Sequence, residues 1–146
     1  MKSKWDSKIA EKIRNPLDLR VYSSRLLGSD PSLVLHGGGN TSVKVSTKDP
    51  WGKRIDLAYI KGSGWDLGNI ERAGFSPVKL NELRRMLQFE ELSDSKMVKL
   101  LRASMIDPYA PTPSVEAILH GLIPYRFVDH THADAVVTIT NTKKGY

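Results

Sequence analysis

The chain has 146 residues, a length that suits one domain with a sizeable core. It contains no cysteine, which excludes disulfides and thiolate metal sites, and its apolar runs are too short for a membrane span or a signal peptide. The formal net charge is +6, but lysine and arginine are scattered along the chain, so we expect most of them to be solvated. We therefore expect no nucleic-acid or membrane partner and a cytoplasmic protein; an anionic substrate would suit the basic surplus.

The N-terminal half predicts helices followed by a β-hairpin. Apolar residues at helical spacing predict a helix over 4–27, with Asn15-Pro16 as a break or the first turn of a second helical stretch over 17–27. Alternation of apolar and polar residues predicts strands over 41–46 and 55–60, joined by a turn at 49–52.

The C-terminal half predicts helices and a further strand. A strand leads into a helix over 75–90, and a second helix covers 96–105 with a cap at Ser93-Asp94. A proline-rich loop over 107–113 precedes a helix from Ser114 to Gly121. Residues 125–130 form a strand, and 133–140 continue it or form a helix. This order of elements predicts a layered α/β or α+β domain over residues 1–146.

His130-Thr131-His132 is the most informative stretch. Histidines at i and i+2 project from one face of a strand, where both imidazoles can reach one metal ion such as zinc. A chance His-x-His pair is equally compatible with the spacing. A zinc site needs at least three protein ligands, and the remaining candidates are His36, His120, Glu116 and Asp129.

Pro113-Ser114-Val115-Glu116 combines a hydroxyl with a carboxylate. As a helix start, Ser114 would cap the helix and Glu116 would lie in its first turn, and spacing alone favours this interpretation. As a functional site, Ser114 and the free N–H groups would bind an anion, and Glu116 would act as a general acid and base.

Two glycine-rich loops flank the predicted hairpin. Gly37-Gly38-Gly39-Asn40-Thr41-Ser42 can turn sharply and direct N–H groups at an anion, although a simple tight turn is the commoner explanation. Lys61-Gly62-Ser63-Gly64 is a similar loop, in which Lys61 either contacts an anion or is a solvated lysine at a strand end. The two loops could converge on one ligand.

These four motifs, in this order, resemble the class II aldolase/adducin family. The forms Gly-Gly-Gly-Asn-Thr-Ser and Lys-Gly-Ser-Gly, with Val115 in the third motif, look most like the aldolase part of bifunctional rhamnulose-phosphate aldolase/dehydrogenase proteins. The resemblance covers residues 17–142. It implies a class II aldolase-like layered domain, with a central, mainly antiparallel sheet flanked by helices.

The resemblance also implies zinc-dependent aldol cleavage of a ketose 1-phosphate to dihydroxyacetone phosphate and an aldehyde. Glu116 would be the acid and base. The family's pattern assigns substrate or phosphate binding to Gly39, Asn40, Thr41, Ser63, Gly64 and Ser114, and two of three zinc ligands to His130 and His132. Val115 replaces a serine found in several sugar-phosphate aldolases, which puts the substrate in doubt.

The family's third zinc histidine follows the His-x-His motif at a distance that this chain does not reach, so we expect a domain incomplete at its C-terminus. We also expect a homo-oligomer. The alternatives are another reaction of the superfamily, namely epimerisation, decarboxylation or dehydration, and a non-catalytic adducin-like binding module.

Overall fold

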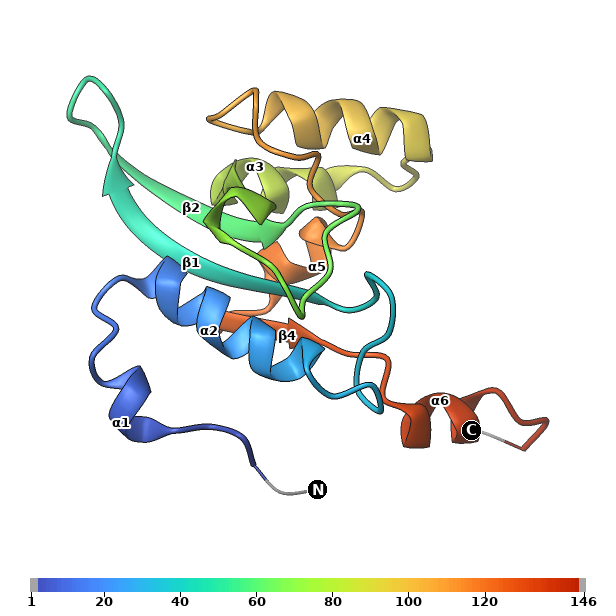
Figure 1. Cartoon of the computed structure of the whole chain (residues 1–146). Helices are drawn as coiled ribbons and strands as arrows, with labels where there is room; N and C mark the ends of the chain where they lie inside the picture. Colours follow the sequence, from blue (N-terminus) through green and yellow to red (C-terminus); the bar gives the residue numbers. More distant parts are fainter. Residues whose placement is uncertain (1–2, 145–146) are drawn as a thin grey trace.

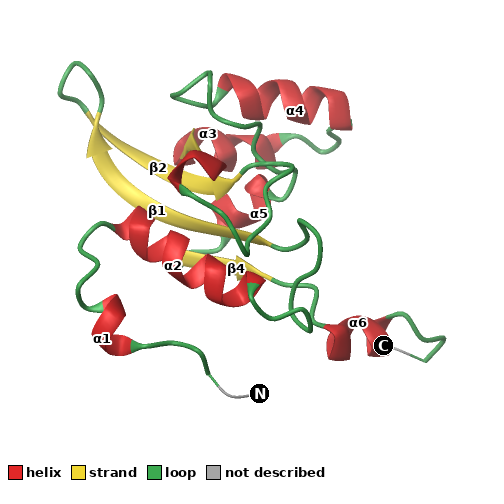
Figure 2. Ribbon diagram, viewed as in Figure 1, coloured by secondary structure: helices red, strands yellow, loops and turns green. Residues whose placement is uncertain are grey.

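The computed structural model describes residues 3–144, and its centre is a four-stranded sheet. The strands lie in the order β3-β2-β1-β4, and all neighbours are antiparallel (Figures 1 and 2). Their bounds are β1 (Asn40–Lys48), β2 (Arg54–Lys61), β3 (Phe75–Lys79) and β4 (Phe127–His130). Helices flank the sheet, which confirms the predicted α/β class with an antiparallel sheet.

The predicted hairpin is β1 and β2, and the side chain of Asp49 closes its turn. Oδ1 of Asp49 accepts hydrogen bonds from the backbone N–H groups of Trp51 (3.0 Å) and Lys53 (2.8 Å). Such an Asx turn is a common way for aspartate to terminate a strand. Seven residue pairs then align β1 with β2, so this hairpin is the longest ladder of the sheet.

Six α-helices and two short 3₁₀ helices make up the rest of the regular structure in residues 3–144. They are α1 (Ser7–Ala10), α2 (Pro16–Gly28), η1 (Arg72–Gly74), α3 (Leu80–Arg85), η2 (Met86–Gln88), α4 (Asp94–Ala103), α5 (Ala117–Leu122) and α6 (Asp134–Thr140). Each helix in this described part is too short or too polar to cross a membrane.

The helix boundaries correct part of the sequence-based prediction. The structure forms only four residues of helix before Asn15, and none of them is buried, so no tertiary packing extends α1. Asn15 instead caps α2 by accepting from the N–H of Leu17 at 2.8 Å, with Pro16 as the first helical residue. Residues 134–140 form helix α6, the second of the two predicted possibilities.

The two faces of the sheet carry separate cores. Figure 1 shows α2 against one face, and α3 and α5 on the other. On the α2 face, Val34, Leu67, Ile70 and Phe75 form a buried cluster. The α3–α5 face carries the larger cluster, whose buried members are Ala58, Ile60, Val78, Leu80, Leu83, Met86, Leu101 and Ala117. The sheet is therefore the middle layer of three, and strand side chains alternate between two environments.

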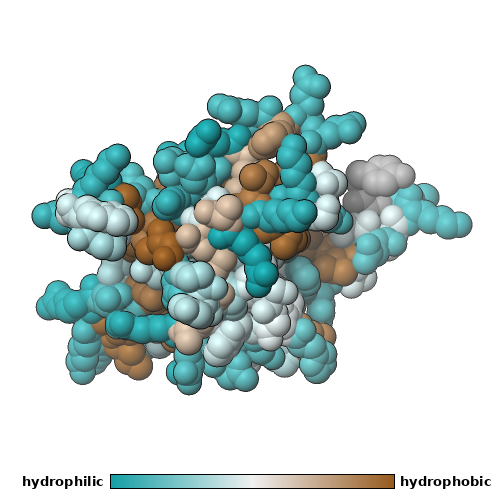
Figure 3. Space-filling model, turned by 90° about the horizontal axis from the view of Figure 1, so that it is seen from above, coloured by the Kyte–Doolittle hydropathy of each residue, from teal (hydrophilic) through white to brown (hydrophobic). Residues whose placement is uncertain are grey.

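Helix α6 lies apart from these layers. It extends beyond the end of β4, away from the sheet (Figure 1), and its Val136 and Ile139 are exposed. Seen from above, hydrophilic residues cover much of the surface of the molecule, and hydrophobic residues form separate patches between them (Figure 3).

Candidate metal centre

Three of the predicted functional side chains meet where β4 ends. Glu116, His130 and His132 each offer one ligand atom, and these atoms lie within 4.8 Å of one another. His130 is the last residue of β4, and the ring of His132 lies 4.8 Å from it, centroid to centroid, at an interplanar angle of 59°. Glu116 comes from the turn before α5. The structure thus brings the predicted His-x-His pair together with the carboxylate.

The polar atoms of this cluster are incompletely paired. Nδ1 of His130 lies 2.8 Å from Oε1 of Glu116, but the ring is not oriented for a hydrogen bond. Within residues 3–144, the buried side-chain atoms without a hydrogen-bond partner include Nδ1 of His130 and both amide atoms of Asn40, besides Nε of Arg20 and Nε2 of His120. Because buried polar groups are nearly always paired, unpaired atoms gathered at one place indicate a binding site.

The environment of Glu116 favours its ionised form. Burial raises the pKa of this carboxyl group, but the neighbouring Asn40 amide, the charge of His130 and the Ser114 hydroxyl together lower the pKa below its usual value. The Ser114 hydroxyl donates to Oε2 of Glu116 at 3.1 Å. Glu116 therefore presents a carboxylate at neutral pH, either to a cation or to a substrate proton.

The Ser114 contact replaces the helix cap that the sequence suggested. Helix α5 begins at Ala117, later than predicted, and Glu116 occupies its N-cap position without a side-chain cap. Oγ of Ser114 instead accepts from the backbone N–H of Glu116 at 3.4 Å, in a local turn. This turn orients Ser114 and Glu116 toward each other.

The Gly37–Gly39 loop passes close to the histidines. A side chain at Gly38 would place its Cβ 3.2 Å from Nδ1 of His132 and 2.8 Å from the carbonyl oxygen of Leu35. Gly39 has a φ of +69°, a conformation that glycine adopts without strain. Asn40 follows directly and pairs with His130 in the β1–β4 register. Gly39 and Asn40 are thus beside the cluster, as predicted.

Thr41 is the exception among the predicted substrate-binding residues. Because strand side chains alternate, Thr41 faces α2, where its hydroxyl shares a 2.8 Å hydrogen bond with that of Ser24. Both residues are fully buried. The side chain of Thr41 stabilises the packing of α2 on the sheet, and we remove it from the predicted site.

The second glycine loop lies beside the proline-rich loop. Gly62 forms a β-bridge with Pro113, and the N–H of Ser63 donates to the carbonyl of Thr112 at 2.9 Å. The N–H of Ser114 donates to the carbonyl of Lys61 at 3.4 Å. These contacts hold Ser63 and Gly64, both exposed, next to the segment that carries Ser114 and Glu116.

Lys61 links the two glycine loops to each other. Its side chain is buried rather than solvated, and Nζ donates to the carbonyl of Gly37 at 2.9 Å. Burial lowers the pKa of Lys61, and the carboxylates of Glu116 and Asp66 oppose that shift. This lysine therefore joins the two loops, a role that neither of the two sequence-based interpretations of Lys61 included.

The other candidate ligands lie elsewhere. His36 is exposed, in a turn with a φ of +43°. His120 is fully buried, and its Nδ1 lies 2.8 Å from Oγ of Ser42. Asp129 projects from the opposite face of β4 and forms an ion pair with Arg20. The structure brings neither His36 nor Asp129 into the cluster.

The burial of Arg20 was not predicted from the sequence, in which this residue is one of many scattered basic side chains. This side chain is 1% exposed and contacts both β1 and β4. The available signal was its helical spacing from Leu17 and Ser24, which places it on the face of α2 that packs on the sheet.

The donor set suits a divalent metal ion. Two imidazole nitrogens and a carboxylate are ligands that zinc accepts, and the unpaired Nδ1 of His130 agrees with a missing partner at this position. No other group of three potential ligands was found among residues 3–144.

Comparison with known proteins gives one family. The family model described as "Class II Aldolase and Adducin N-terminal domain" matches residues 19–146. The solved N-terminal class II aldolase domain of a conserved protein from Thermoplasma acidophilum is 43% identical, with a TM-score of 0.90 over 98% of this chain and 65% of that one. "Uncharacterized oxidoreductase YuxG" of Bacillus subtilis is 40% identical over 141 residues, which are 97% of this chain and 20% of the relative. The chain thus spans less than two thirds of either relative.

Proposed function

Because this chain belongs to the class II aldolase and adducin family, we propose that it performs metal-dependent aldol cleavage of a ketose 1-phosphate. The products would be dihydroxyacetone phosphate and an aldehyde, and rhamnulose 1-phosphate is the first substrate to test. The observation that carries the proposal is the cluster of Glu116, His130 and His132, with ligand atoms within 4.8 Å of one another.

His130 and His132 would hold the metal through imidazole nitrogens, next to the carboxylate of Glu116. A zinc ion bound there would supply Lewis-acid polarisation of the substrate carbonyl. The phosphate would be bound by Gly39, Asn40, Ser63, Gly64 and Ser114. Ser63 and Gly64 are exposed, so they are accessible to an anion, and the Asn40 amide lies beside the Glu116 carboxylate.

Glu116 would move the proton. Aldol cleavage takes a proton from the hydroxyl of the departing aldehyde carbon and returns one to the carbon that keeps the electron pair. A carboxylate can accept the first proton and return the second, and the lowered pKa of Glu116 keeps it in the ionised form that accepts a proton. The hydrogen bond from Ser114 would keep the carboxylate oriented toward the substrate.

The test combines metal analysis with turnover. We expect the purified protein to bind zinc and to release dihydroxyacetone phosphate from rhamnulose 1-phosphate in a coupled assay. Replacing His130 with alanine should remove the metal, and Glu116→Gln should lower kcat by at least about 100-fold, a typical contribution of general acid–base catalysis. Glu91→Gln, an exposed glutamate outside the cluster, is the matched control. An unchanged rate in Glu116→Gln would remove this residue from the mechanism.

Two alternatives give different outcomes. If the metal binds but no aldehyde forms, product analysis by NMR distinguishes epimerisation, decarboxylation and dehydration of sugar phosphates or sugar acids. If neither metal nor sugar phosphate binds, an adducin-like binding module is the better description. The B. subtilis relative is named an oxidoreductase, and this chain matches one fifth of its length.

We also propose a homo-oligomer in the cytoplasm, as the family resemblance suggested. Sedimentation measurements would test the assembly.

A further inference from the structure

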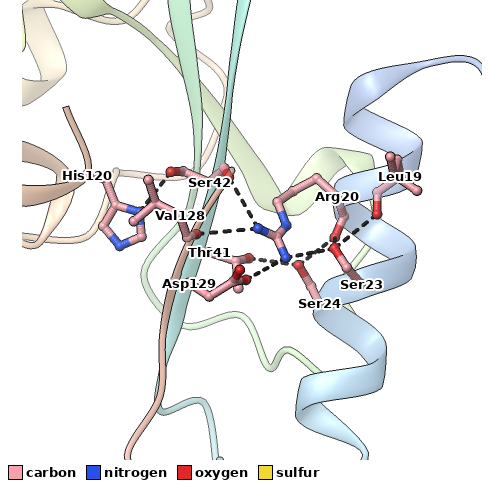
Figure 4. A network of polar contacts seen from close by, with 9 residues as sticks. All are labelled: Leu19, Arg20, Ser23, Ser24, Thr41, Ser42, His120, Val128 and Asp129. Atoms are coloured by element: carbon pink, nitrogen blue, oxygen red, sulfur yellow. Dashed lines mark hydrogen bonds and ion pairs between the residues drawn. The ribbon is translucent and has the colours of Figure 1, made fainter. Parts of the chain in front are cut away.

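We propose that Arg20, on helix α2, is a positioning residue for the histidine ligands and acts on them through Asp129. The inference rests on the proposed metal site and adds a residue from the other side of the sheet. Figure 4 shows Arg20 on one side of the two strands and His120 on the other. His130 is next to Asp129 on β4, so its side chain points to the face opposite Arg20.

Arg20 joins β1 to β4 at a single rung of the ladder. Ser42 and Val128 are partners in the β1–β4 register, and Nη1 of Arg20 donates to both of their carbonyls, at 3.3 and 3.4 Å. Nη2 forms an ion pair with Oδ1 of Asp129 at 2.5 Å and donates to Oγ of Ser23 at 2.7 Å. One guanidinium thus contacts the backbone of both strands and the side chain that precedes His130.

The strand that carries the metal ligands needs this anchor because its own ladder is short. β4 contains four residues at the edge of the sheet, and four residue pairs align it with β1, compared with seven pairs between β1 and β2. Register is weakly specified in strands that are polar on both faces, and Asp129 and His130 make the end of β4 polar on both of its faces. A contact that is specific for one residue pair of the ladder therefore strongly influences the register that β4 adopts against β1.

A slip of one residue would destroy the metal site. Side chains alternate along a strand, so a one-residue shift exchanges the two faces. A slip in one direction would place the carboxylate of Asp129 beside Glu116, and a slip in the other direction would place His130 beside the guanidinium of Arg20. The first arrangement brings two carboxylates together, and the second takes His130 away from Glu116 and His132. The Arg20–Asp129 pair thus favours the register in which His130 faces Glu116.

A backbone hydrogen bond holds the segment that follows β4. The N–H of His132 donates to the carbonyl of Leu33 at 3.0 Å, so the position of His132 depends on how β4 leaves the sheet. With the register fixed by Arg20, both imidazoles approach the Glu116 carboxylate from the same side. Loss of the anchor should therefore weaken metal binding without removing any ligand.

The test is a zinc titration of the metal-free full chain against a chromogenic chelator, with the cobalt absorption spectrum as a reading of ligand geometry. We expect Arg20→Met to weaken zinc binding by about 10- to 100-fold, the range found for residues that orient metal ligands, and to change the cobalt spectrum. Arg20→Lys keeps the charge but cannot span both carbonyls and the carboxylate, so it should also weaken binding.

Two controls separate positioning from general destabilisation. Arg25→Met removes another arginine of α2, whose Nε donates to the carbonyl of Ile70. Leu101→Ala removes a buried side chain of α4, so this variant should have a lower Tm but an unchanged zinc affinity. If Arg20→Met does not fold, Asp129→Asn decides, because it removes the ion pair and keeps the shape. Zinc affinity within twofold of the unmodified chain in Arg20→Met, or in Asp129→Asn if Arg20→Met does not fold, would overturn the inference. Absence of zinc binding by the unmodified chain would instead overturn the proposed function itself.

Discussion

His120 should make the stability of this domain depend on pH in the weakly acidic range. Its side chain has no exposed surface and shares a hydrogen bond with Ser42. Burial lowers the pKa of His120 from 6.5 to about 4; the carboxylate of Glu116 opposes the shift, and the positive groups His130 and Lys44 add to it. In the unfolded chain the imidazole regains its ordinary pKa, so between these values the unfolded state binds a proton that the folded state does not.

The sign and the size of this change in the free energy of unfolding follow from the linkage between proton binding and unfolding. The free energy of unfolding is unaffected by this group above pH 6.5 and falls as the pH drops from there toward 4, because protonation stabilises only the unfolded state. With these two pKa values the loss is about 2 kcal/mol at pH 5 and about 3 kcal/mol at pH 4. Such a loss is a large part of the stability of a typical domain.

Urea unfolding followed by circular dichroism, with EDTA present, measures this loss. We expect the unmodified chain to lose about 2 kcal/mol more than His120→Gln between pH 7.5 and pH 5, although the variant is less stable at pH 7.5. His36→Gln, which replaces an exposed histidine, should follow the unmodified chain. Equal losses in the unmodified chain and His120→Gln would refute the assignment of a neutral, buried His120.

Further substitutions test the packing around the site by urea unfolding. Gly62→Ala would place a Cβ 2.5 Å from two ring carbons of Pro111 and should cost about 1–3 kcal/mol, through displacement of the loop that aligns Ser114. Gly52→Ala, with a φ of +85° and no atom within 4 Å, should cost only the backbone strain of about 1 kcal/mol; an equal loss in both would contradict the clash. Leu83→Ala should cost about 2–5 kcal/mol, since the side chain is fully buried against α5.

Local patterns in the sequence predicted the hairpin and several helices because their signals are short-range. Asp49 and Gly52 mark the turn between two alternating segments, and Pro16 follows a capping asparagine. The first predicted helix was mostly wrong because periodic apolar residues do not stabilise a helix that buries none of them. Tertiary packing, rather than local preference, decides such cases.

The residues of the site also divide into those that the sequence predicted and those that only the structure shows. His130, His132 and Glu116 were selected by residue type, and the structure places them together. The pairing of Asn40 with His130 depends on two strands far apart in the sequence, for which no local signal exists. For the same reason, the burial of Lys61 and the assignment of Thr41 to the α2 face required the assembled sheet.

The edge position of β4 has a consequence for how the protein folds during synthesis. β1 emerges early in synthesis and pairs with β2, but its other edge waits for β4, whose residues are far away in the sequence, as in the pairing of Asn40 with His130. Until β4 arrives, β1 presents unpaired N–H and C=O groups, the kind of edge on which chains aggregate. Contacts between residues so far apart in the sequence form slowly. The metal ligands therefore take their positions in the same late step of folding in which β4 covers the edge of β1.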